Sequence, residues 1–321
     1  MKGQLTKKIC FCLVLLVVLL AWIPVAGAQS YPTKPITIVV PMAAGAATDV
    51  LLRNVQKVLP KYLEQPLVVD LRPGAGGAIG TDFVAKAAPD GYTLLGGGPG
   101  WNSTLPAIEN RSKGPDDLDA VCQINSSSSF TLVRTESPFK TFQDVIAYVK
   151  ANPGKLSYGH TGIWGAADLF WKEVKLQYGI TTRDVSHEGG GQMMMALLGG
   201  HIDIGTTAPP AAMPQIQAGK LRPLMYNTDR KFTAMPQVPS TSEVGVKARD
   251  NFWRGVLVPK GTPKPVIDKL AAAFKKVTED KEFIDLIAQF GEEPGYLGPE
   301  ELTKMWIEEF NTRKELGRIL K

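Results

Sequence analysis

Residues 36–51 read ITIVVPMAAGAATDVL, and three physical features follow one another in this stretch. The first five residues are β-branched, which is typical of a buried strand. Segment 41–48 is then made mostly of small residues, which permit a tight turn and a close approach to the backbone. Thr48 and Asp49 suit the positive start of a helix, whose apolar face begins at Leu51. The stretch therefore predicts a buried strand, a small-residue loop and a helix.

The same order recurs along the chain, which predicts an α/β protein. Small-residue loops occur at 41–48, 73–80, 96–101, 159–165 and 188–192. Strands that alternate with helices indicate a parallel sheet covered by helices, and ligands gather at the carboxyl ends of such strands. A tight turn alone explains one loop of this kind. Five together favour a pocket whose helix starts attract an anion.

The N-terminus matches a secretory signal peptide. Lys2, Lys7 and Lys8 precede an apolar run over 9–23, and Ala26-Gly27-Ala28 forms an A-x-A cleavage site. The sequence thus predicts export to the periplasm, with residues 1–28 removed. A retained membrane anchor is the alternative, because the apolar run is long enough to span a bilayer. No second run of this length occurs in the sequence.

Removal of this leader changes what the charge implies. The 321-residue chain carries a formal charge of +5, which on its own hints at an anionic partner such as nucleic acid. The leader holds three lysines and no acidic residue, so the remaining 293 residues carry +2. We therefore expect no nucleic-acid binding. Cys122 is the single cysteine outside the leader, and its apolar neighbours predict a buried thiol rather than a nucleophile.

Catalytic motifs are scarce in this sequence. Loop 73–80 gives G-x-G-x-x-x-G, which misses the dinucleotide fingerprint by one residue. There is no G-x-S-x-G elbow or H-E-x-x-H motif, and His160, His187 and His201 lack the spacing of metal ligands. We expect no cofactor, no metal and no catalytic residue, and for His160 a hydrogen bond to a ligand. A secreted hydrolase is the alternative from another class, because a triad is defined by geometry rather than by order.

Seven motifs resemble those of the substrate-binding proteins of tripartite tricarboxylate transporters, also called Bug-type receptors. They occur in one order and cover nearly all of the chain after the leader. The motifs are Tyr31–Ile36, Arg72–Gly80, Ala88–Leu95, Ala151–Leu156, Leu198–Asp203, Gln215–Arg222 and Pro259–Pro263.

This resemblance implies a type II-like periplasmic binding protein, with two α/β lobes that close on a ligand in the cleft between them. Lobe 1 is expected over 29–127 and 250–321, and lobe 2 over 128–249. The implied function is the binding of a small organic carboxylate, either a di- or tricarboxylate or an aromatic acid. A monomer would deliver this anion to the subunits of a membrane transporter. An extracytoplasmic sensor that presents its ligand to a signalling kinase is the alternative within binding proteins.

The resemblance also implies that backbone amides and waters hold much of the ligand. The residues that carry over are Ala43, Ala44, Gly45, Thr48, Ala78, His160, Thr161, Trp164 and Thr206.

Three side chains depart from the family pattern or add to it. Trp164 and His160 stand in a loop that is often rich in Ser, Gly and Asn, and they predict a larger or aromatic carboxylate. Arg254 has two alternatives that the sequence leaves open. It clamps a carboxylate with two nitrogens, or it forms an ion pair at the hinge.

Overall fold

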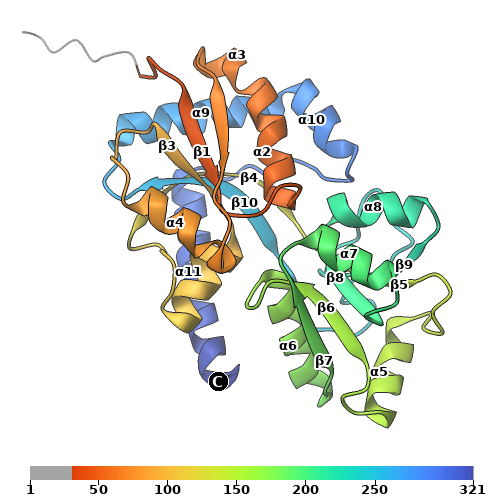
Figure 1. Ribbon diagram of the computed structural model, residues 1–321. Helices are drawn as coiled ribbons and strands as arrows, with labels where there is room; N and C mark the ends of the chain where they lie inside the picture. The colour runs from red at the N-terminus through yellow and green to blue at the C-terminus, as the bar shows by residue number, and fades with distance from the viewer. Residues whose placement is uncertain (1–30, 321) are drawn as a thin grey trace, which may run out of the picture. The chain divides into compact units, whose positions relative to one another are not determined.

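In the computed structural model, which describes residues 31–320, the strands form two five-stranded sheets (Figure 1). The leader predicted over residues 1–28 lies outside the described residues. The chain from Lys34 onward forms one compact unit that contains both sheets.

Sheet 1 has the strand order β2-β1-β3-β10-β4. The first three strands are parallel, whereas β10 lies antiparallel between β3 and β4. The parallel sheet predicted from the alternation is therefore confirmed for β1, β2 and β3 and wrong for β10. β10 enters directly from the side of the other sheet, without the crossover helix that a parallel connection requires. The strands are β1 (Ile36–Val40), β2 (Leu67–Leu71), β3 (Thr93–Gly97), β4 (Leu118–Ser127) and β10 (Phe252–Pro259).

Sheet 2 repeats this mixed arrangement in the order β7-β6-β8-β5-β9. β6 is parallel to β7 and β8, whereas β5 runs antiparallel to β8 and β9. The strands are β5 (Phe130–Arg134), β6 (Ser157–Thr161), β7 (Arg183–His187), β8 (Ile204–Thr207) and β9 (Leu221–Tyr226).

Helices cover both sheets, which explains why the central strands read as continuous apolar runs. Around sheet 1 they are α2 (Ala47–Val58), α3 (Pro60–Leu63), η1 (Ala75–Gly77), α4 (Ala78–Ala85), the π-helical η2 (Gly100–Glu109), α9 (Lys264–Glu279), α10 (Lys281–Ala288) and α11 (Pro299–Leu320). Around sheet 2 they are α5 (Phe142–Ala151), α6 (Ala166–Tyr178), α7 (Gly190–Leu198) and α8 (Pro209–Gln217).

Separate apolar cores hold the two sheets. Trp253 and Trp306 are buried in the core of sheet 1, with their rings 6.2 Å apart. Sheet 2 has one core that includes Trp171 and Phe142, and another that includes Met193 and Phe130. Cys122 is fully buried, and burial raises the pKa of its thiol, as the apolar neighbours predict. Each sheet with its helices is called a lobe below.

The chain passes between the lobes at two adjacent places. β4 ends at Ser127 and β5 begins at Phe130, whereas β10 begins at Phe252. Phe252 pairs with Ser127, so the two connections lie side by side. The lobe boundaries at 127/128 and 249/250 stay a prediction, and these strand ends lie close to them.

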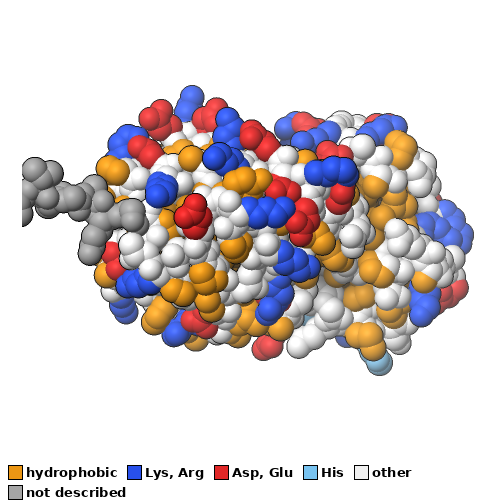
Figure 2. All heavy atoms as spheres, turned by 90° about the horizontal axis from the view of Figure 1, so that it is seen from above, with side chains coloured by type: hydrophobic (Ala, Val, Ile, Leu, Met, Phe, Trp, Pro, Cys, Tyr) orange, Lys and Arg blue, Asp and Glu red, His pale blue; other side chains and the backbone are white. Residues whose placement is uncertain are grey.

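The surface seen from above mixes both signs of charge (Figure 2). On this face, Lys and Arg side chains alternate with Asp and Glu, and apolar side chains lie between them. A surface of mixed charges creates no broad field of one sign.

Candidate functional site

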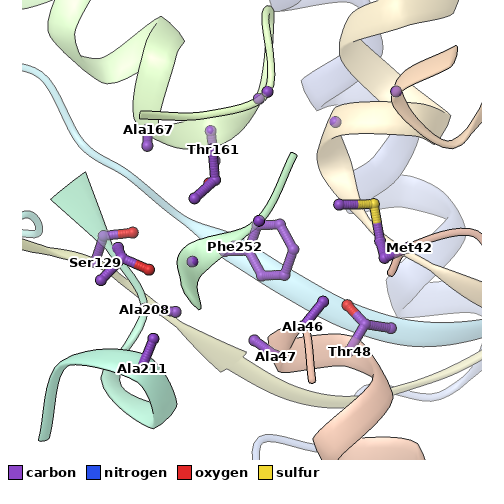
Figure 3. A pocket seen from close by; sticks show the side chains of 18 of the residues that line it. Met42, Ala46, Ala47, Thr48, Ser129, Thr161, Ala167, Ala208, Ala211 and Phe252 are labelled. Carbon is purple, nitrogen blue, oxygen red and sulfur yellow. The ribbon is translucent and has the colours of Figure 1, made fainter. Parts of the chain in front are cut away.

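A cavity of about 110 Å³, here called the inner cavity, lies between the two sheets. Its wall comes from both lobes. Figure 3 shows Phe252 in the middle of this wall, between Thr161 on one side and Ala46 and Ala47 on the other. Four of the five small-residue loops contribute two or more residues each, among them Thr48, Trp101, Gly165 and Gly190.

Four helices begin at the inner cavity, and this is its main electrostatic feature. The wall contains the first residues of α2, α6, α7 and α8. Their N-cap residues are Ala46, Gly165, Gly189 and Ala208, and none of them caps its helix with a side chain. The first N–H groups of a helix lack partners inside the helix, and the helix dipole adds positive charge there. α8 begins with Pro209 and Pro210, which have no N–H, so α2, α6 and α7 offer the N–H groups and α8 adds its dipole. Such helix ends around one cavity make it suited to an anion.

The side chains of the inner cavity add no charge of their own. Among the described residues that line it there is no Asp, Glu, Lys, Arg or His. Hydroxyl groups come from Ser and Thr side chains, including Ser129 and Thr161. The apolar part of the wall includes Trp101 and Phe252, whose rings meet edge to face at 5.9 Å. The wall therefore offers polar helix ends to an anionic group and apolar rings to the rest of a ligand.

A second, outer cavity of about 500 Å³ adjoins the first. The two share Met42, Leu105 and Ile163 in their walls. Unlike the inner cavity, the outer one is lined by charged residues, among them Glu109 and Arg111. The outer cavity thus continues the same cleft with a different chemistry.

The ten residues predicted for the site fall into three groups. Gly45, Thr48 and Thr161 line the inner cavity, and Ala43 and Trp164 line the outer one. The remaining five line neither of these two cavities and are Ala44, Ala78, His160, Thr206 and Arg254. Contact of any of the ten with a ligand stays a prediction.

His160 lies within strand β6 rather than in the glycine-rich turn where the sequence placed it. Its side chain is buried, with Nδ1 3.0 Å from the carbonyl oxygen of Gly162 and Nε2 3.7 Å from Asp168 Oδ1. Burial lowers the pKa of His160, although the nearby Asp168 carboxylate opposes this. The imidazole therefore holds the loop that follows β6 and positions Thr161, its neighbour in the wall.

Arg254 forms a buried ion pair. Its Nη2 lies 2.6 Å from Glu292 Oε1, and both side chains are almost fully buried. Nη1 donates to the carbonyl oxygen of Ala47 at 3.3 Å, so the guanidinium supports the start of α2 from behind. Of the two alternatives for Arg254, this geometry is that of the ion pair.

Several wall residues were not predicted as ligand contacts. Gly100 and Trp101 lie in one small-residue loop and Gly189 lies in another, so the sequence indicated these loops but not these residues as ligand contacts. Ser129 and Phe252 come from the two connections between the lobes. No local pattern distinguishes such residues, because they reach the cavity only when both connections lie side by side.

Metal-ion clusters and membrane-spanning helices are two features that the described residues do not form. Within residues 31–320, no group of three or more His, Cys, Asp or Glu side chains is placed to hold a metal ion. In the same range, no helix has both the length and the apolar character needed to cross a membrane.

Three solved structures share this architecture over most of their length. The periplasmic binding protein BugD is 30% identical, with a TM-score of 0.82, over 90% of this chain and 98% of BugD. Rpa4515 of R. palustris, solved with adipate, is 26% identical with a TM-score of 0.84, over 90% of this chain and 98% of that one. MatC of Rhodopseudomonas palustris, solved with bound malate, is 25% identical with a TM-score of 0.82, over 89% of this chain and 100% of that one.

The family model described as "Tripartite tricarboxylate transporter family receptor" matches residues 51–321, which is most of the chain. Family and fold are those of substrate-binding receptors rather than of enzymes. Membership in a family of periplasmic binding proteins implies a periplasmic location. With its two mixed-sheet lobes and the cleft between them, the chain belongs to the family of tripartite tricarboxylate transporter receptors, of the Bug type.

Proposed function

We propose that this receptor binds a small organic carboxylate in the inner cavity and delivers it to a tripartite tricarboxylate-type membrane transporter. The observation that carries the proposal is the meeting of four helix starts, without side-chain caps, at a cavity whose wall holds no charged side chain. Two related structures contain malate and adipate, and both ligands are dicarboxylates.

Binding would work through a change in the arrangement of the lobes. A ligand that contacts helix starts of both lobes favours the state in which the lobes lie together, because only that state offers all the contacts. Lobe 1 (29–127 and 250–321) and lobe 2 (128–249) would close about the paired connections near Ser127 and Phe252. No covalent step is needed, and the protein would act as a monomer after loss of residues 1–28.

The ligand-binding set would combine the predicted wall residues with those that the cavity adds. The first N–H groups of α2, α6 and α7, at Ala47, Ala166 and Gly190, would bind the carboxylate. Phe252 and Trp101 would pack against the carbon body of the ligand. This wall accommodates an aliphatic chain or an aromatic ring, so the choice between a dicarboxylate and an aromatic acid belongs to the test.

A thermal-shift panel on the chain from Gln29 onward tests the proposal. The panel contains malate, adipate, citrate and benzoate, with adipamide as the uncharged control. A ligand concentration of 100 times Kd stabilises the folded protein by about 2.7 kcal/mol, which raises Tm by several degrees. We expect at least one acid to raise Tm without being consumed, and adipamide to leave Tm unchanged. If no acid shifts Tm, or if an acid is turned over, the proposal is wrong.

A further inference from the structure

A hydrogen bond joins the two lobes across the outer cavity. The indole Nε1 of Trp164 donates to Glu109 Oε1. Trp164 belongs to the loop between β6 and α6 in lobe 2, whereas Glu109 is the last residue of η2 in lobe 1. Both residues line the outer cavity and neither lines the inner one. The bond therefore lies beside the proposed ligand site rather than in it.

Lobe 2 holds the donor in place. Trp164 has a φ of +61°, which bulky L-residues rarely adopt unless the surroundings hold them there. Its backbone N–H donates to Asp168 Oδ2 at 2.7 Å. Lys172 bonds to Asp168 as well and places its ammonium group 4.8 Å from the centre of the indole ring. The direction of the indole is thus set by contacts within its own lobe.

Lobe 1 holds the acceptor in a matching way. The other carboxylate oxygen of Glu109, Oε2, lies 2.8 Å from Arg111 Nη1. Asn110, between them, has a φ of +53° and ends η2. The salt bridge occupies one oxygen and leaves Oε1 for Trp164, and a bond to an ionised acceptor is stronger than one between neutral groups.

The backbones of the two lobes also approach closely near this bond. A Cβ atom built on Gly100 of lobe 1 would lie 3.8 Å from the Cα of Gly165 in lobe 2. Gly165 directly follows Trp164, so the hydrogen bond and the backbone contact depend on the same approach of the lobes. Neither can exist when the lobes move apart.

We propose that Trp164 and Glu109 form a clasp that holds the lobes closed over the ligand, so that Trp164 is a positioning residue and not a ligand contact. This proposal rests on the carboxylate-binding function proposed above. Because the bond exists only in the closed state, it favours that state by its own free energy. Its loss shows in the rate of ligand release, since the rate of entry into the open cleft does not depend on it.

Stopped-flow release of adipate tests the clasp. Trp164→Phe keeps a ring but loses the N–H donor, and Glu109→Ala loses the acceptor. We expect each variant to release adipate about tenfold faster, and the double variant to be no faster than either alone. Trp171→Phe is the matched control, because Trp171 Nε1 donates to Thr182 Oγ1 at 3.0 Å within lobe 2. It should release adipate at the wild-type rate.

A second measurement does not need a ligand. Spin labels at Lys150→Cys on α5 and Lys275→Cys on α9, both exposed positions, report the distance between the lobes. Labelling is specific to these two positions because Cys122 is buried and does not react. We expect Trp164→Phe to broaden this distance distribution towards longer values. The clasp is disproved if Trp164→Phe leaves both the distribution and the adipate release rate unchanged. If none of the four acids of the thermal-shift panel binds but the distribution broadens, the clasp stands and the proposed ligand class falls.

Discussion

At the scale of single residues, the functional site depends on buried charge behind its wall. Arg254 and Glu292 form an ion pair with side-chain exposures of 1% and 3%. Arg254 Nε has no hydrogen-bond partner among the described residues, so the pair is not fully satisfied. A buried charge that loses its partner is strongly destabilising, whereas removal of both charges together is often tolerated.

We therefore predict that Arg254→Met lowers the free energy of unfolding by about 3–5 kcal/mol, because Glu292 is left buried without a positive partner and keeps only the hydrogen bond from Asn125. Urea denaturation measures this loss, and the double variant Arg254→Met/Glu292→Leu should recover most of it. Lys281→Met is the control, since the exposed pair of Lys281 with Asp285 contributes at most about 1 kcal/mol. Unchanged stability together with lost adipate binding would instead favour the carboxylate clamp.

At the scale of elements, the four helices that begin at the inner cavity lack the usual side-chain caps. Gly189 is the N-cap of α7, with extended backbone at φ −173°. No atom lies within 4 Å of the position that a Cβ would take there. A capping side chain would therefore fit at Gly189 without strain, and its absence leaves the helix start open to a ligand.

We predict that Gly189→Asp raises the stability of α7 by a few tenths of a kcal/mol and weakens adipate binding at least tenfold. The new carboxylate would cap the helix and repel the anionic ligand from the same N–H groups. Gly189→Asn has the same shape without the charge, so it should weaken binding much less. Isothermal titration calorimetry compares the two variants, and equal affinities would contradict an anion site at this helix start.

At the scale of the whole receptor, function depends on how closely the lobes approach. Gly100 lines the inner cavity and lies opposite Gly165. Its backbone is not in the left-handed region, so a larger residue is permitted locally. A larger residue at this position is excluded only by the contact with Gly165 when the two lobes lie together.

We predict that Gly100→Leu props the lobes apart, because its side chain would extend into the space that Gly165 occupies. Small-angle X-ray scattering should then show no decrease in the radius of gyration on addition of adipate, and affinity should fall at least tenfold. Gly100→Ala places its Cβ at an ordinary contact distance, so this control should still close. Closure of Gly100→Leu with wild-type affinity would show that this contact is not part of the bound state.

Local sequence predicted most elements of this receptor, because strands and helices follow from patterns over a few residues. The strand at 36–40, the small-residue loop and the helix after it all form as expected. The position of β10 was not predictable, since its antiparallel insertion between β3 and β4 depends on where the chain returns from lobe 2. His160 was misplaced because β6 continues through a run of polar and small residues that reads as a turn.

The sequence alone determined that small residues precede helix starts at several strand ends, and hence that this chain offers backbone N–H groups to an anion. Local geometry suffices for that, because strand, loop and helix are adjacent in the chain. The tertiary structure decided the partners of the large side chains. Trp164 reaches Glu109, 55 residues away, and Arg254 reaches Glu292, 38 residues away. The first pair depends on the packing of the two lobes and the second on the packing within lobe 1, and no short stretch of sequence contains either.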